Sequence, residues 1–146
     1  MIDDTQLISV LQTVISPVVL ISGVGMLVLS MTNRFSHTAD RARLLAYEHQ
    51  KVDEVARERV AVQIRILYHR LRILLLAIAC ALGSVLLTAL LITTLFANYL
   101  FATTFRGAIV VLFALSLLSL VSSLILFIRD MSLSLTALQE DLHGIL

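Results

Sequence analysis

The chain has 146 residues, of which 59% are hydrophobic and 14% are charged, and its mean hydropathy is +0.97. A soluble domain usually carries about 25% charged residues. This composition therefore argues against a soluble globular protein and indicates an integral membrane protein. The net charge of +1 excludes no class of partner by itself.

Three stretches lack charged residues, namely 5–33, 73–105 and 107–128. A helix that crosses a bilayer needs about 20 residues, so each stretch is long enough. We predict an all-α fold that forms a single membrane domain over residues 1–146. Its parts are transmembrane helices at 5–33, 73–98 and 107–128, a long cytoplasmic helical segment at 34–72, an outer turn at 99–106, and a cytoplasmic amphipathic tail at 129–146.

Basic residues are concentrated between the first two spans. Nine of the eleven Lys and Arg residues lie in residues 34–72, whereas the segment before the first span carries only Asp3 and Asp4. By the positive-inside rule the basic segment faces the cytoplasm. The sequence therefore predicts an N-terminus outside and a C-terminus inside.

Small and polar residues form a stripe along the first span. Ser9, Ser16, Gly23 and Ser30 recur every seven residues, and Gln12 lies near the same side. Contact with lipid tails does not stabilise polar groups, so we expect the stripe to face protein or water. Leu20 and Leu27 fall on the same face.

Pro17 interrupts the hydrogen bonding of this span, and Gly23 and Gly25 follow within two turns. A kink followed by small residues is typical of a hinge. Ordinary close helix packing explains the same residues slightly better.

Residues 33–43 lie at the predicted inner surface of the membrane. Asn, Ser, Thr and Asp favour helix caps, so we expect a helix break near 33–39. Asp40 is expected to pair with Arg43 or Arg41, or with Arg34 from another helix. His37 and Asp40 alone are too few ligands for a metal ion.

The run Ser16–Gly25, followed by Asn33-Arg34 and Asp40-Arg41-Ala42-Arg43, resembles a bacterial family of small three-helix membrane proteins described as a domain of unknown function. The resemblance covers most of the chain. It implies the three-helix topology and a bacterial inner-membrane location, and it carries no catalytic or ligand assignment.

The remaining segments are predicted to pack. Residues 40–72 lack Gly and Pro and predict an amphipathic helix that could continue into the second span. The tail carries an apolar stripe at helical spacing, which we expect to dock on that helix rather than lie on the membrane. Ser116, Ser119 and Ser123 are expected to bond to the backbone of their own helix.

Two large functional classes are disfavoured. The three spans contain no Asp, Glu, His, Lys or Arg, so they offer neither a catalytic acid–base pair nor the intramembrane ionisable group of a proton-coupled transporter. We expect that the protein is not an enzyme and that it has no cofactor and no metal site. Acidic residues are interspersed with the basic ones, so nucleic-acid binding is not expected.

Two functions remain open. The first is a homo-oligomeric ion channel. The path for its inorganic ion would be lined by Ser9, Gln12, Ser16, Gly23 and Ser30. Leu20 and Leu27 would be its constrictions. Asp3 and Asp4 would form an outer acidic ring and Arg34 an inner basic ring, with cations slightly favoured. In the second, a structural or regulatory membrane protein has no pore, and its cytoplasmic helices bind a partner. Membrane lipids surround the chain in both.

Overall fold

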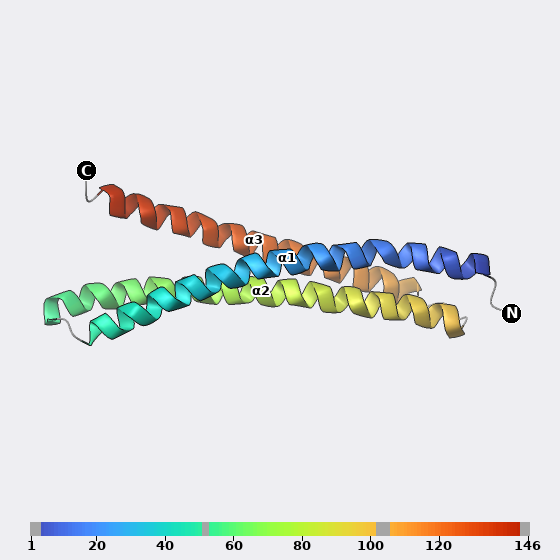
Figure 1. Ribbon diagram of the computed structural model, residues 1–146, viewed down its shortest axis with the longest axis horizontal. Coiled ribbons are helices and arrows are strands. Elements are labelled where there is room, and N and C mark those ends of the chain that lie inside the picture. Colours follow the sequence, from blue (N-terminus) through green and yellow to red (C-terminus); the bar gives the residue numbers. More distant parts are fainter. Residues whose placement is uncertain (1–3, 51–52, 102–105, 144–146) are drawn as a thin grey trace. The chain divides into compact units, whose positions relative to one another are not determined.

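The computed structural model describes residues 4–50, 53–101 and 106–143, and the regular structure in these ranges is helical. Helix α1 spans Asp4–His49, α2 spans Glu54–Phe101 and α3 spans Arg106–His143. Figure 1 shows them in chain order, with α1 in blue to cyan, α2 in green to yellow and α3 in orange to red. The predicted all-α fold with three long helices is confirmed.

Each helix contains a segment that is long and apolar enough to cross a membrane. These segments are Pro17–His49, Arg57–Leu100 and Arg106–Ser134. Large apolar side chains are exposed along all three helices, for example Met26, Leu86 and Val110. Contiguous exposed apolar surface is uncommon on soluble monomers. The surface is therefore compatible with a multi-pass membrane protein.

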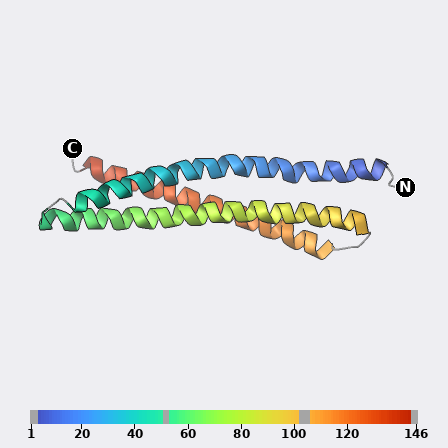
Figure 2. The same ribbon diagram turned by 60° about the horizontal axis from the view of Figure 1, so that its bottom comes forward.

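The first break in the helices lies after His49, so the predicted break near 33–39 is wrong. The end of α1 and the start of α2 lie side by side in both views (Figures 1 and 2). The Gln50 amide donates to the Tyr47 carbonyl at 3.3 Å, and the Arg57 amide donates to the Asp53 carbonyl at 3.0 Å. Asp53 thus occupies the N-cap position of α2, where aspartate is favoured. No single helix runs from residue 40 into the second span.

The polar residues at 33–39 are accommodated inside α1. Thr38 Oγ1 donates to the Arg34 carbonyl at 2.9 Å, which satisfies the hydroxyl within the helix. The segment also contains neither Gly nor Pro. Residues that favour caps do not enforce one, and the helix continues where its side chains find such partners.

The third span and the tail form one helix, rather than a span followed by a separate C-terminal helix. Helix α3 passes through Arg129 and Asp130 and ends at His143. No Gly or Pro occurs between Gly107 and Gly144, so nothing in the backbone chemistry stops the helix at the end of the apolar stretch. Side chains beyond Ser134 lie outside the described part of the structure, so the docking of the tail stays a prediction.

The chain divides into two compact units, and every helix contributes to both. Unit 1 comprises Met1–Val28 and Cys80–Ser122, and unit 2 comprises Leu29–Ala79 and Ser123–Leu146. In unit 1, helices α2 and α3 approach closely at Gly83. A Cβ placed on Gly83 would lie 3.3 Å from Ser119 Oγ, and this Oγ donates to the Cys80 carbonyl at 2.7 Å. The missing side chain of Gly83 leaves the space that this contact uses.

In unit 2, the same two helices are joined by Ser123. Its Oγ donates to the Ala77 carbonyl of α2 at 2.7 Å, and both residues are fully buried. Leu74 and Met31 are buried completely in this unit as well. The small side chains of Ala77 and Ser123 permit the close approach, and the larger ones fill the space beside it.

The predicted bonding of the α3 serines is correct for one of the three. Ser116 Oγ donates to the Phe113 carbonyl of its own helix at 2.8 Å. Ser119 and Ser123 donate instead to carbonyls of α2. Both face small residues of α2, so the partner helix comes close enough to compete with the serine's own backbone.

Candidate functional site

Three charged side chains from three helices meet in unit 2, and we call Arg34, Arg70 and Asp130 the buried ion cluster. Arg34 Nη2 of α1 lies 3.2 Å from Asp130 Oδ2 of α3. Arg70 Nε of α2 lies 3.3 Å from Asp130 Oδ1. The Asp130 side chain is 0% exposed, that of Arg70 14% and that of Arg34 31%. Each carboxylate oxygen therefore accepts a hydrogen bond from one guanidinium group.

The cluster lies where the uncharged stretches of all three helices end. Arg34 directly follows residues 5–33, Arg70 lies just before residues 73–105, and Asp130 lies just after residues 107–128. An isolated carboxylate buried at this level would cost several kcal/mol. The two arginines offset that cost only when the three helix ends lie together, so the cluster fixes the positions of these ends within unit 2.

Phe127 contributes to the same cluster from α3. The Arg34 Cζ atom lies 5.7 Å from the centroid of the Phe127 ring, a cation–π distance worth about 0.5–1 kcal/mol or more. Phe127 precedes Asp130 by three residues, so both lie on one face of α3. Within the described residues, every buried side-chain nitrogen and oxygen atom has a hydrogen-bond partner.

Sequence reasoning did not identify Asp130 or Arg70 as site residues. One signal was available, because Asp130 is an acidic residue beside the end of an apolar stretch, and charged residues near a membrane need a partner. Which arginine is the partner of Asp130 depends on how the helices are arranged.

The predicted pairing of Asp40 is confirmed for one of its candidates. Arg43 Nη1 lies 3.5 Å from Asp40 Oδ1, and the two side chains are 81% and 66% exposed. Arg34 pairs with Asp130 instead of Asp40. Arg41 is exposed. The exposed Asp40–Arg43 pair is of the kind that contributes about 0.3–0.5 kcal/mol.

The residues predicted to line the pore and to form its outer acidic ring fall into three groups. Gln12, Gly23 and Ser30 are exposed on α1, whereas Leu20 and Leu27 are half-buried. Ser9, Ser16 and Asp4 belong to α1, but their side chains lie outside the description, and Asp3 lies outside the described residues altogether. The exposed members carry uncharged polar or small groups on the outside of the chain.

The predicted hinge residues lie within a continuous helix. Pro17 is inside α1, and the helix continues past it to His49. No atom lies within 4 Å of a Cβ placed on Gly23 or Gly25, so the backbone of α1 is open to its surroundings at both positions. Bending at this segment stays a prediction.

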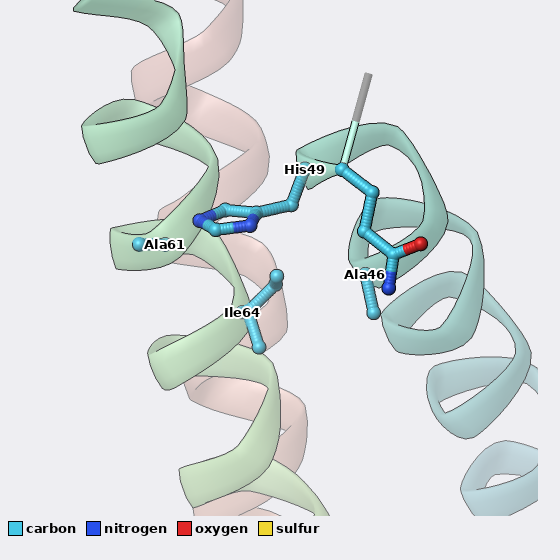
Figure 3. Close-up of a pocket in the computed structure, with 5 residues that line it drawn as sticks. Ala46, His49, Ala61 and Ile64 are labelled. Carbon is cyan, nitrogen blue, oxygen red and sulfur yellow. The ribbon is translucent and has the colours of Figure 1, made fainter. Parts of the chain in front are cut away.

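A shallow pocket lies in unit 2 between the end of α1 and the start of α2. Figure 3 shows the His49 ring directed from α1 toward α2, where Ala61 and Ile64 lie. Ala46 and Gln50 complete the lining. His49 is the one residue of this lining whose side chain carries an acid–base group, so the pocket does not bring a pair of catalytic groups together. The described residues contain no group of three His, Cys, Asp or Glu placed to hold a metal ion.

Comparisons with known proteins give one family. Neither the curated proteins nor the solved structures yield a match to the chain. A family model described as "Protein of unknown function (DUF2721)" matches residues 14–140. The match includes the segment at 16–43 on which the resemblance was based and extends over all three helices. The chain therefore belongs to the DUF2721 family.

Proposed function

We propose that the chain forms a homo-oligomeric ion channel in which several copies of α1 surround a water-filled path. The observation that carries this proposal is the exposed, uncharged polar face of α1, with Gln12, Gly23 and Ser30 on the outside of the chain. In a bilayer such a face is stabilised by protein or by water, and not by lipid tails. A ring of α1 helices provides both.

The residues of the stripe have separate roles in this proposal. The amide of Gln12 and the hydroxyls of Ser9, Ser16 and Ser30 replace part of the hydration shell of an inorganic ion, and oxygen ligands of this kind favour cations. Leu20 and Leu27 form constrictions that close the path by dewetting. Asp3 and Asp4 attract cations at the outer mouth. The expected inner ring of Arg34 is left out of this lining, because Asp130 of α3 holds that side chain within unit 2.

The proposed location is a bacterial inner membrane, with the N-terminus outside and the C-terminus in the cytoplasm. Nine basic residues between the first two apolar stretches support this orientation. The end of α1 and the start of α2, which lie side by side (Figures 1 and 2), then extend into the cytoplasm as a helical hairpin. This hairpin is positioned to join the subunits and to transmit a gating signal.

Ionic current across planar bilayers containing the purified protein tests the proposal, with Gln12→Leu as the key variant. We expect the wild-type protein to conduct and Gln12→Leu to lower the conductance or shift the reversal potential, because the leucine removes an amide from the lining. Val18→Leu is the matched control, since exposed Val18 lies away from the polar stripe, and its current should equal that of the wild type. Silence from folded, oligomeric protein at all voltages and in both salt gradients would contradict the channel.

A non-conducting structural or regulatory protein is the second candidate, and the open backbone at Gly23 and Gly25 favours it. Since no atom lies within 4 Å of a Cβ at either position, another helix can approach α1 closely there. The stripe is then a seam between subunits, and the cytoplasmic helices bind a partner protein. Oligomeric protein that carries no current, together with loss of the oligomer in a Gly23→Leu variant, supports this candidate.

A further inference from the structure

The buried ion cluster is not electrically balanced. Two guanidinium groups, those of Arg34 and Arg70, face the single carboxylate of Asp130, so one positive charge is left over. The remaining ion pair among the described residues, Asp40–Arg43, is separate from the cluster and exposed. At the edge of an apolar layer a charge is stabilised by water or by an anion beside it.

The arginines also have donors to spare. Each guanidinium group carries five N–H donors in a planar fork, and the carboxylate of Asp130 uses Nη2 of Arg34 and Nε of Arg70. No buried side-chain atom among the described residues lacks a partner, so the donors that Asp130 does not engage are satisfied or lie where solvent reaches. Arg34 is 31% exposed and Arg70 14% exposed. Some N–H donors of the two guanidinium groups are therefore available to a ligand that approaches from outside the helices.

The position of the cluster along the helices determines which anion lies close to it. All three cluster residues lie within a few positions of the end of an uncharged stretch, which is the depth of the phospholipid headgroups when these stretches span a bilayer. The basic end of the chain faces the leaflet that carries anionic lipids.

We infer that Arg34 and Arg70 bind the phosphate of an anionic phospholipid headgroup, which neutralises the charge that Asp130 leaves over. A phosphate diester presents oxygen acceptors in the geometry that a guanidinium fork matches. Asp130 keeps both arginines in place from the buried side, and the lipid completes their hydrogen bonding from the exposed side. This inference depends on the membrane placement and not on conduction.

Native mass spectrometry of the full chain, released from detergent micelles with added phosphatidylglycerol or phosphatidylcholine, tests the inference. We expect phosphatidylglycerol to bind more tightly than phosphatidylcholine. Arg34→Gln should weaken phosphatidylglycerol binding by about tenfold, the usual effect of losing a hydrogen bond to a charged group. Arg34→Lys should retain part of the binding, because the charge remains. Arg41→Gln is the matched control, since this exposed arginine lies two turns further along α1 and outside the cluster.

The outcomes separate the sources of the phosphate. In Arg34→Gln, Asp130 still pairs with Arg70, so the variant should fold, and circular dichroism checks this. If the variant does not fold, the lipid preference of the wild type and the phosphatidylglycerol binding of Arg34→Lys test the inference instead. Equal binding of the two lipids, or equal loss in Arg41→Gln and Arg34→Gln, would overturn a defined site. Displacement of phosphatidylglycerol by millimolar inorganic phosphate would overturn the assignment to a lipid.

Discussion

Replacing Asp130 by asparagine should lower the free energy of unfolding by about 3 kcal/mol, since removal of one partner from a buried ion pair typically costs 3–5 kcal/mol. The lower end of that range is expected because Arg34 is 31% exposed and keeps some access to water. The substitution leaves two arginines close together without a carboxylate between them. Equilibrium unfolding in detergent micelles, followed by circular dichroism, measures the loss.

The control for this prediction is Asp40→Asn. Asp40 also pairs with an arginine, but both side chains of that pair are largely exposed, so the expected loss is about 0.5 kcal/mol or less. Double-mutant cycles of Asp130→Asn with Arg34→Gln and with Arg70→Gln should each give a coupling energy well above that of the Asp40–Arg43 pair. Equal, small effects of Asp130→Asn and Asp40→Asn would show that the cluster does not hold the helices.

Replacing Gly83 by leucine should lower the free energy of unfolding by about 1–3 kcal/mol, the usual cost of overpacking. The leucine Cβ alone would lie 3.3 Å from Ser119 Oγ, and the rest of the side chain would push α3 away from α2. The hydrogen bond from Ser119 to the Cys80 carbonyl would then be lost. Gly83→Ala should change the stability far less, because better helix propensity, about 1 kcal/mol, offsets a small shift of the serine.

Gly107→Leu serves as the matched control in the same unit. No atom lies within 4 Å of a Cβ placed on Gly107, and the residue is exposed at the start of α3. We expect this variant to be as stable as the wild type or slightly more so. A destabilisation of Gly107→Leu equal to that of Gly83→Leu would contradict the close contact between α2 and α3.

The fold was predictable to the extent that it depends on composition and periodicity. Long uncharged stretches predict three long apolar helices, and the structure confirms them. The helix ends were less predictable. Capping residues occur at 33–39 and again at Asp53, and only Asp53 caps a helix, at the start of α2. Local propensity is similar at the two places, so the outcome depends on partners such as the Arg34 carbonyl that accepts from Thr38.

The site was predictable only in part, because its members come together through tertiary contacts. The stripe of α1 is visible in the sequence as a seven-residue repeat, and Gln12, Gly23 and Ser30 are exposed in the structure. The buried ion cluster unites residues that are 36 and 60 positions apart along the chain. A periodic pattern in the sequence does not show which residues at such separations come into contact. The same holds for Ser119 and Ser123, whose acceptors lie on another helix.

The most direct test of the proposed path is the accessibility of α1 to a charged, membrane-impermeant thiol reagent while current is recorded. The single cysteine, Cys80, is first removed by Cys80→Ser. Gln12→Cys and Ser30→Cys are then compared with Val18→Cys in that background. We predict that the reagent lowers the current irreversibly at positions 12 and 30 and leaves it unchanged at position 18. Currents that the reagent leaves unchanged at all three positions, or lowers only at position 18, would contradict a path lined by this face of α1.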